Sequence, residues 1–278
     1  MSDRTPSDPA RRPAPPASVS RPVASPLWPS VVWRAEDADA LDAQYEGRTR
    51  GYAYARESHP NAEMLAAAID ALEGAPEAGG GGLMFGSGMG AVSAVLLGLV
   101  SSGDRVIASN QLYGRTLRLM TQDLPRFGVA VDFIDPTDAA AWAQAANTPA
   151  ALVFAEVVSN PTLRIADMEA ARAAARACGA LFVVDNTFTT PRGWRPFEHG
   201  ADVVLHSVTK LLAGHSDATL GWVAARDAGV REKLAAAQGS IGATASPFDC
   251  WLAERGLLSF GLRYDRAEAN AAALADHL

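Results

Sequence analysis

Cysteine is scarce in this 278-residue sequence. Cys178 and Cys250 stand far apart, and no CxxC pattern occurs. A disulfide framework or a structural zinc site needs clustered or regularly spaced cysteines, so neither is indicated. Histidines 199, 206 and 215 lack the i, i+4 spacing of paired metal ligands on a helix, and we expect no metal site. Two unpaired thiols suit a reducing cytoplasm.

Positive charge and long apolar runs are also scarce. Lys and Arg number 24 against 31 Asp and Glu, which gives a net charge of -7 and argues against an extended polyanion such as nucleic acid. No run approaches the ~18 apolar residues of a membrane helix, and residues 1–30 lack the apolar core of a secretion signal. We therefore expect a soluble, cytoplasmic protein that acts on small molecules, without nucleic-acid or membrane partners.

Most of the chain alternates helical and strand patterns. Residues 1–20, rich in Pro, Ser, Ala and Arg, are expected to form a disordered tail. Residues 61–74 carry one apolar face and end at Gly74, as a helix does. Residues 79–90 are expected to form a glycine loop, and residues 115–128 a single helix. Apolar runs at 150–158, 180–185, 201–207 and 218–225 are typical of strands covered by helices on both faces. Together these patterns predict a doubly wound α/β domain with a mainly parallel sheet.

Polar residues follow several of these runs, at the edge of the sheet where ligands bind in such folds. Taken alone, Asn160 before Pro161 and Asp185 before Asn186 are more typical of turns than of a site. The stretch "LHSVTKLLAGHSD" (205–217) is harder to explain as a turn, because it places a lysine and two hydroxyls directly after a strand. Its chemistry depends on what else the sheet edge carries.

Three interpretations compete for this stretch and for the glycine loop "GSGMGA" (86–91). A dinucleotide-binding loop fits poorly, because Ser109 and Asn110, not an acidic residue, follow the second strand. A serine acyl enzyme would use the SxxK spacing of Ser207 and Lys210, but no KTG element accompanies it. The third interpretation is a Schiff base between Lys210 and pyridoxal phosphate.

A pyridoxal phosphate site needs three further elements, and the sequence offers all of them. A carboxylate must keep the ring nitrogen protonated, and Asp185 ends a core strand where it would do so. An aromatic side chain must cover the ring, and Tyr113 follows strand 105–109. An anion cradle is available at the start of the helix predicted over 88–101, from the amides of Ser87, Gly88 and Met89 with the hydroxyls of Ser207 and Thr209.

Longer motifs carry a family resemblance. The segments are "GYAYAR" (51–56), "FGSGMGAV" (85–92), "YGRT" (113–116), "EVVSNPTLRIADM" (156–168), "DNTFTTP" (185–191) and "HGADVVLHSVTKLLAGHSD" (199–217). In order and spacing they resemble the Cys/Met metabolism family of pyridoxal phosphate enzymes, the trans-sulfuration group, from about Pro22 to the end of the chain. The resemblance implies the PLP-dependent transferase fold of type I, like aspartate aminotransferase.

The resemblance also implies a role for each matching position. Lys210 matches the internal aldimine lysine, which the substrate amine displaces and which then moves the alpha proton. Asp185 matches the partner of the pyridinium nitrogen, and Tyr113 the stacking and acid-base tyrosine. Arg118 matches an arginine near the substrate, and Asn160 a side chain beside the ring. The phosphate site matches Ser87, Gly88, Met89, Ser207 and Thr209, and Tyr54 and Arg56 match residues that cross to the neighbouring subunit.

The implied protein is therefore a homo-oligomer, a dimer with shared active sites that pairs into a tetramer. Its implied activity is gamma-replacement or gamma-elimination on sulfur amino acids or O-acylhomoserine, most like cystathionine gamma-synthase or gamma-lyase. An O-acylhomoserine sulfhydrylase, and a PLP-binding but catalytically impaired truncated paralogue, stay open as alternatives.

Three departures from the family pattern stand out. The segment "ESHPNAE" (57–63) alters a turn near the interface arginine, Arg56. Arg115 stands where methionine gamma-lyases have a cysteine, which weakens an assignment as a methionine gamma-lyase. Residues 246–278 resemble only the linker and first helix of the small C-terminal domain, so we expect an incomplete sequence. The expected organisation is a tail at 1–20, an arm at 21–55 that reaches the neighbouring site, a PLP-binding domain at 56–245, and a truncated domain at 246–278.

Overall fold

The computed structural model describes residues 18–278, so the expected tail lies outside the described residues up to position 17. A seven-stranded sheet forms the centre, with the strands in the order β1-β7-β6-β5-β4-β2-β3. The strands are β1 (Leu83–Phe85), β2 (Arg105–Ser109), β3 (Ala130–Ile134), β4 (Leu152–Glu156), β5 (Leu181–Asp185), β6 (Val203–His206) and β7 (Gly221–Ala225). Strands β2 to β6 are parallel to one another, and β7 is antiparallel to both β6 and β1. The predicted mainly parallel sheet is confirmed.

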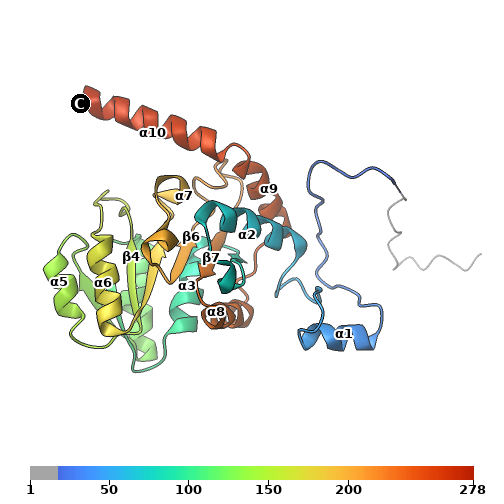
Figure 1. Cartoon of the computed structure of the whole chain (residues 1–278), viewed down its shortest axis with the longest axis horizontal. Coiled ribbons are helices and arrows are strands. Elements are labelled where there is room, and N and C mark those ends of the chain that lie inside the picture. Colours follow the sequence, from blue (N-terminus) through green and yellow to red (C-terminus); the bar gives the residue numbers. More distant parts are fainter. Residues whose placement is uncertain (1–17) are drawn as a thin grey trace, which may run out of the picture.

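Ten helices surround or follow the sheet in the described part of the chain (Figure 1). They are α1 (Ala38–Tyr45), α2 (Pro60–Glu73), α3 (Gly88–Leu99), α4 (Gly114–Arg118), α5 (Ala139–Ala145), α6 (Met168–Cys178), α7 (Thr190–Gly193), α8 (Ala228–Ile241), α9 (Pro247–Leu257) and α10 (Phe260–His277). Short helical turns cover Glu77–Gly79, Leu119–Asp123, Leu124–Phe127 and Pro196–His199. None of the helices among residues 18–278 has the length and apolar character needed to cross a membrane.

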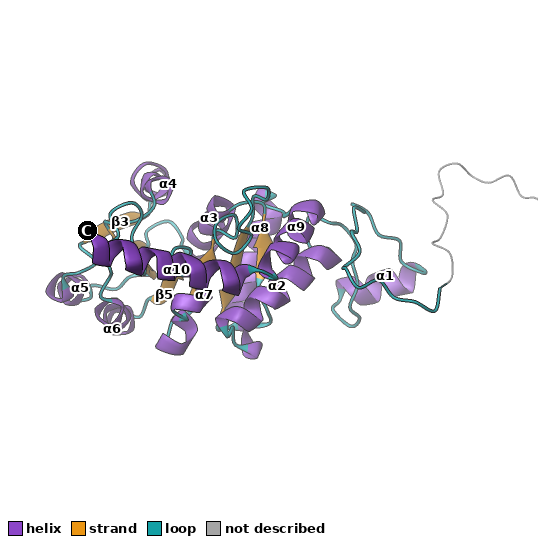
Figure 2. Ribbon diagram, turned by 90° about the horizontal axis from the view of Figure 1, so that it is seen from above, coloured by secondary structure: helices purple, strands orange, loops and turns teal. Residues whose placement is uncertain are grey.

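Both faces of the sheet are covered, as the continuous apolar runs predict. Successive strand residues alternate between faces, so Val153 joins one hydrophobic core while Leu152 and Phe154 join the other. The first core includes side chains of α2, α5, α6 and α9, and the second includes side chains of α3 and α8. Figure 2 shows α3 and α4 on one side of the strands and α5 and α6 on the other. The doubly wound arrangement leaves the carboxyl ends of the parallel strands open for a site.

Two local predictions differ from the structure. The stretch after Gly79, expected to be a glycine loop, contains the edge strand β1, because Leu83–Phe85 pair with Gly221–Ala225 of β7. The single helix expected over 115–128 is α4 followed by a π-helical turn and a 3-10 turn. Pro125 accounts for the irregular end, because proline donates no backbone hydrogen bond and clashes with the preceding helical turn.

The altered turn at 57–63 starts α2. His59 is its N-cap: Nδ1 accepts a hydrogen bond from the Ala62 N–H at 3.1 Å, so the opposite nitrogen, Nε2, donates to the Ala245 oxygen at 3.0 Å. Pro60 follows at the first helical position, where its missing N–H costs nothing. Burial lowers the pKa of His59, which favours this neutral tautomer. The turn is therefore a helix cap that also ties α2 to the segment before α9.

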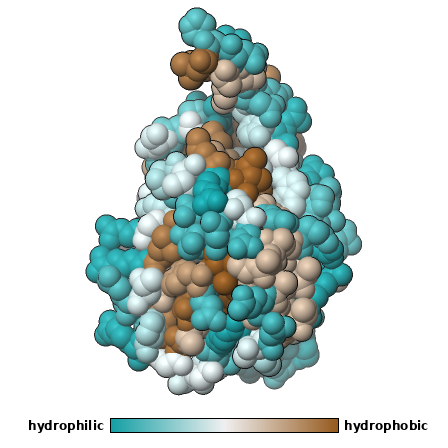
Figure 3. Space-filling model, turned by 90° about the vertical axis from the view of Figure 1, so that its left-hand side faces the viewer, coloured by the Kyte–Doolittle hydropathy of each residue, from teal (hydrophilic) through white to brown (hydrophobic). Residues whose placement is uncertain are grey.

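Two segments stand apart from the sheet. Figure 1 shows α1 and its flanking loops beyond the end of the molecule that is opposite α5, and α10 extending over the other end. Val32, Tyr45 and Tyr54 of the first segment are 67%, 66% and 41% exposed. On α10, Leu262 and Leu274 are 77% and 58% exposed, and Figure 3 shows this helix standing above the body with apolar atoms at its tip. Both segments thus present apolar side chains outward.

Candidate functional site

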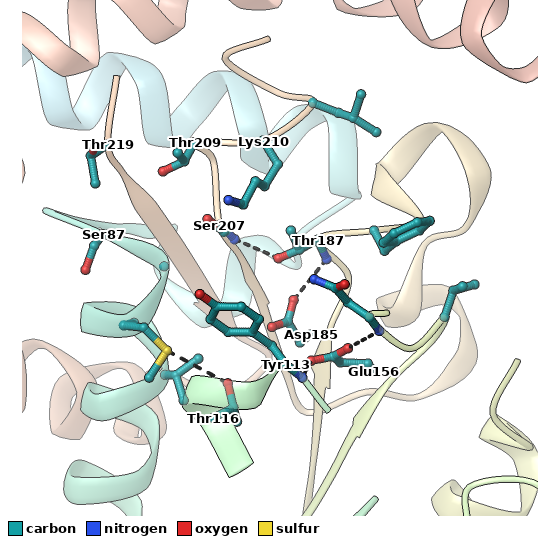
Figure 4. A pocket seen from close by; sticks show the side chains of 17 residues that line it. Ser87, Tyr113, Thr116, Glu156, Asp185, Thr187, Ser207, Thr209, Lys210 and Thr219 are labelled. Carbon is teal, nitrogen blue, oxygen red and sulfur yellow. Dashed lines mark hydrogen bonds between the residues drawn. The ribbon is translucent and has the colours of Figure 1, made fainter. Parts of the chain in front are cut away.

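A cavity of about 550 Å³ opens where the carboxyl ends of β4, β5 and β6 meet the N-terminus of α3. Figure 4 shows side chains from all of these elements directed into it. Nine of the residues predicted from the sequence line this cavity, namely Ser87, Gly88, Met89, Tyr113, Asn160, Asp185, Ser207, Thr209 and Lys210. The sheet topology therefore gathers residues that lie up to 123 positions apart, from Ser87 to Lys210, around one space.

Asp185 forms the base of the cavity at the end of β5. Its Oδ1 accepts a hydrogen bond from the Thr187 N–H at 3.0 Å. Burial raises the pKa of Asp185 above its ordinary value, and this outweighs the lowering by Thr187 and by the charge of His206. A carboxyl group in this environment resists ionisation when alone, and a cation placed against it would favour the ionised form.

The N-terminus of α3 forms one wall. Ser87 is the N-cap, and its Oγ accepts a hydrogen bond from the Gly90 N–H at 2.9 Å. The next two residues of the first turn, Gly88 and Met89, line the cavity, and amides at this position have no partner within the helix. A Cβ at Gly88 would lie 2.6 Å from the Cβ of Ser207, so only glycine lets the helix approach the loop after β6 this closely. The first turn of a helix is a suitable site for an anion.

Lys210 extends into the cavity from the turn after β6, above Asp185 (Figure 4). Its backbone is fixed by bonds from Lys210 N–H to the Ser207 oxygen at 3.1 Å and from Gly214 N–H to the Lys210 oxygen at 2.8 Å. Within residues 18–278 no carboxylate forms an ion pair with its ammonium group. The amine is thus held by its backbone and left accessible to a ligand.

Thr209 is more constrained than the sequence suggests. Its Oγ1 donates to the Leu220 oxygen at 3.1 Å and accepts from the Leu220 N–H at 2.9 Å. Because a hydroxyl group has a single hydrogen, Thr209 has no further proton to give to an anion unless it releases Leu220. The Ser207 N–H donates to Thr187 Oγ1 at 2.7 Å, which links the loops after β5 and β6.

Glu156 lines the same cavity and was missed in the sequence. It ends β4, is 7% exposed, and accepts hydrogen bonds from the Tyr113 N–H at 2.6 Å and the Asn160 N–H at 3.3 Å. Burial, followed by the charge of Asp185, raises its pKa to about 8. One signal was available: Glu156 is the sole charged residue in the apolar run at 150–158.

Behind the site, a buried polar cluster joins α2 to the ends of β5 and β6. Glu73 Oε1 contacts His206 Nε2 and accepts a hydrogen bond from Asn186 Nδ2 at 2.8 Å. All three side chains are fully buried. His206 and Asn186 are the chain neighbours of Ser207 and Asp185, so this cluster anchors two residues of the cavity from the opposite face of the sheet.

Three predicted site residues lie outside the cavity. Arg118 on α4 donates to Gln122 Oε1 at 3.0 Å, and the exposed Arg115 on the same helix does not line the cavity either. Tyr54 and Arg56 are exposed, and the guanidinium carbon of Arg56 lies 5.3 Å from the centroid of the Tyr54 ring. Among the described residues, no arginine contributes to the cavity wall.

Comparisons with known proteins identify the relatives of this chain. A model of the family described as "Cys/Met metabolism PLP-dependent enzyme" matches residues 14–278. A cystathionine beta-lyase of Bacillus subtilis is 40% identical over 81% of this chain and 56% of its own length. The chain thus spans little more than half of this curated relative, and about 60% of a Bacillus subtilis cystathionine gamma-lyase.

Solved structures share the fold. A cystathionine gamma-synthase of Xanthomonas oryzae superposes with a TM-score of 0.79 at 36% identity, over 86% of this chain and 59% of that one. These matches confirm the predicted fold class and the family resemblance. Because the family model covers the chain from residue 14 to its last residue, the protein belongs to the Cys/Met metabolism family of PLP-dependent enzymes.

Proposed function

We propose that the chain binds pyridoxal 5'-phosphate in this cavity through Lys210. The observation that carries the proposal is the convergence of an unpaired amine, a half-buried carboxyl group and a helix N-terminus around one cavity of about 550 Å³. The amides of the first turn of α3, with Ser207, suit the phosphate, and the raised pKa of Asp185 suits a site that receives a cationic ring nitrogen. Tyr113 and Asn160 would flank the ring.

The chemistry of the site follows from these residues. When bound, pyridoxal phosphate supplies an electron sink that stabilises negative charge at the alpha carbon of an amino acid. Asp185 would hold the proton on the ring nitrogen, because its own carboxyl group gains most from a neighbouring cation. Lys210 Nζ would accept the alpha proton and return it at another carbon. The hydroxyl group of the partly exposed Tyr113 would donate a proton to the departing group.

The proposed activity is that of a trans-sulfuration enzyme. It acts on sulfur amino acids or O-acylhomoserine by gamma-replacement or gamma-elimination, most like a cystathionine gamma-synthase or gamma-lyase, with O-acylhomoserine sulfhydrylase as the alternative. The similarity to a cystathionine beta-lyase adds elimination at the beta carbon to the reactions worth assaying. We place the enzyme in the cytoplasm, in keeping with its two free cysteines.

A second candidate is a pyridoxal phosphate binder with impaired catalysis. The observation that favours it is the cavity wall, in which Lys210 is the one cationic side chain among the described residues. An amino-acid substrate needs a cation for its carboxylate, and Arg118 points to Gln122 instead. The two candidates differ in turnover, not in cofactor binding.

The proposed assembly is a homodimer with shared sites that pairs into a tetramer. Tyr54 and Arg56 are exposed and lie outside the cavity of their own chain, as residues that serve a neighbouring subunit would. The exposed apolar residues of the segment around α1 also suit burial against another copy. Sedimentation at several protein concentrations would test the assembly.

The cofactor assignment has a clean test because the chain has only two lysines, Lys210 and Lys233. We expect the purified chain with pyridoxal phosphate to show a visible absorption band that Lys210→Ala abolishes. Lys233→Ala, an exposed position on α8, is the matched control and should keep the band. After borohydride reduction, mass spectrometry should find the cofactor on the peptide with Lys210. A band that persists in Lys210→Ala, or an adduct on Lys233, would refute the assignment.

Turnover then separates the two candidate functions. Cystathionine, methionine, O-acetylhomoserine and O-succinylhomoserine are incubated in parallel with the loaded chain, the two esters with and without added cysteine or sulfide. Release of ammonia, and formation of cystathionine from added cysteine or of homocysteine from added sulfide, are measured. Formation of product from any of these substrates supports the proposed enzymatic activity. A normal absorption band without turnover would favour the impaired binder.

A further inference from the structure

Glu156 occupies an unusual place for a charged residue. It ends β4 and pairs in parallel register with Asp185, the last residue of β5, so the two carboxyl groups leave neighbouring strands at the same edge. Figure 4 shows them side by side beneath Lys210. Burying two carboxyl groups together is costly, because each charge disfavours the other. A group kept in such a position needs a reason in the structure or in the chemistry.

The hydrogen bonds of Glu156 supply that reason. Oε1 accepts the backbone N–H of Tyr113 at 2.6 Å, and Oε2 accepts the backbone N–H of Asn160 at 3.3 Å. Tyr113 begins α4 after β2, and Asn160 lies in the loop after β4. One carboxyl group therefore joins the loops after β2 and β4 at Tyr113 and Asn160 themselves, and the Thr162 hydroxyl joins the same loops farther along by donating to Gln111 Oε1 at 2.8 Å.

Both bridged residues send their side chains into the cavity. Each backbone nitrogen is bonded to the Cα that carries the side chain, so holding both nitrogens on one carboxyl group restricts the separation of the two side chains. Tyr113 is 43% exposed and Asn160 is exposed as well, so packing restrains these two residues only weakly. Glu156 itself, at 7% exposure on a central strand, has little such freedom.

We propose that Glu156 is a positioning residue that sets the width of the slot between the Tyr113 and Asn160 side chains, into which the cofactor ring fits. The inference rests on the proposed function, because the slot has this meaning only if pyridoxal phosphate binds there. Glu156 needs no contact with substrate or cofactor for this role. It acts through the two loops that it joins.

The test replaces Glu156 by glutamine, which keeps the shape of the side chain. A glutamine oxygen can accept one of the two N–H groups, but its amide then points a donor at the other. Losing one such bond weakens cofactor affinity about tenfold. We expect this increase in the Kd for pyridoxal phosphate, measured by titrating the visible band, and a weaker visible circular dichroism signal per bound cofactor, because the ring is less firmly stacked. The matched control is Glu169→Gln on the surface of α6, which should bind like the wild type.

A double-mutant cycle separates positioning from general loss of structure. If Glu156 acts through Tyr113, Glu156→Gln should have a smaller effect on the Kd in a Tyr113→Ala background than in the wild type. Fully additive effects, or a Glu156→Gln variant with wild-type Kd and circular dichroism, would overturn the inference and leave the cofactor assignment intact. A wild-type chain that binds no cofactor would overturn both.

A second variant keeps the proposal testable if Glu156→Gln does not fold. Glu156→Asp keeps the carboxyl group but shortens its reach, so it should lose the longer bond, to Asn160, before the shorter one. The same direction of change in Kd is expected, and an unchanged Kd would count against the bridge.

Discussion

Replacing Glu156 by glutamine should make the stability of the cofactor-free chain less sensitive to alkaline pH. The ordinary pKa of 4.5 is raised to about 8 in the folded chain. The folded state therefore holds this proton more tightly than the unfolded state, and the wild type loses stability as the pH rises from about 4.5 to about 8. Glutamine does not ionise, so the variant escapes this loss.

The size of the effect follows from the two pKa values. At about 1.36 kcal/mol per unit, the penalty grows by about 4 kcal/mol between pH 5 and pH 9. Against it stands the loss of one N–H acceptor, about 1 kcal/mol at every pH. The variant should thus be slightly less stable than the wild type at pH 5, where the charge penalty is still below about 1 kcal/mol. At pH 9 it should be clearly more stable.

Thermal unfolding of the cofactor-free proteins measures this difference. A change of about 4 kcal/mol corresponds to a shift of roughly 8 °C or more in the difference between the two Tm values. The Glu169→Gln control removes an exposed carboxylate and should run parallel to the wild type at all pH values. A difference between Glu156→Gln and the wild type that stays constant from pH 5 to pH 9 would refute the reasoning.

Two further predictions concern the supports of the cavity. Gly88→Ala should weaken cofactor binding at least tenfold, because the new Cβ would meet a neighbouring side chain at 2.6 Å; Gly261→Ala, where a Cβ meets nothing within 4 Å, should bind normally in the same titration. Glu73→Ala leaves a buried histidine and amide without their acceptor and should lower the free energy of unfolding by about 3–5 kcal/mol, measured by denaturant melts. Glu73→Gln keeps an acceptor oxygen and should cost less, so equal losses in the two variants would contradict the explanation by a lost acceptor.

Local patterns in the sequence predicted much of the fold. The apolar run at 150–158 contains β4, and the run at 201–207 contains β6, because strands covered on both faces need continuous apolar residues. Strand β1 escaped prediction because three apolar residues among glycines show no periodicity, and its pairing with β7 joins residues far apart in the sequence. The helix after Tyr113 was predicted in place but not in form, since Pro125 disrupts its last turns.

The site residues that belong to local sequence motifs could be predicted. Asp185 ends a strand and Lys210 lies in the turn after the next one, and parallel strands bring their carboxyl ends to one edge. To predict that Glu156 lies beside Asp185 in the site, one must know the register between β4 and β5, which no local sequence pattern contains. The contact of Glu73 with His206 joins residues 133 positions apart, so it too appears only in three dimensions. The roles of Tyr54, Arg56 and Arg118 stay predictions.

The pairing of Glu156 with Asp185 implies that insertions should be tolerated very unevenly along this chain. One residue added inside β4 would turn every later side chain of the strand to the opposite face, so the carboxyl group would point toward α6 and its two loops would lose their common anchor. A residue added at Gly179, at the exposed end of α6, would leave both strands in place. The spacing of the site thus depends on strand register, and it should depend much less on the length of exposed turns such as the one at Gly179.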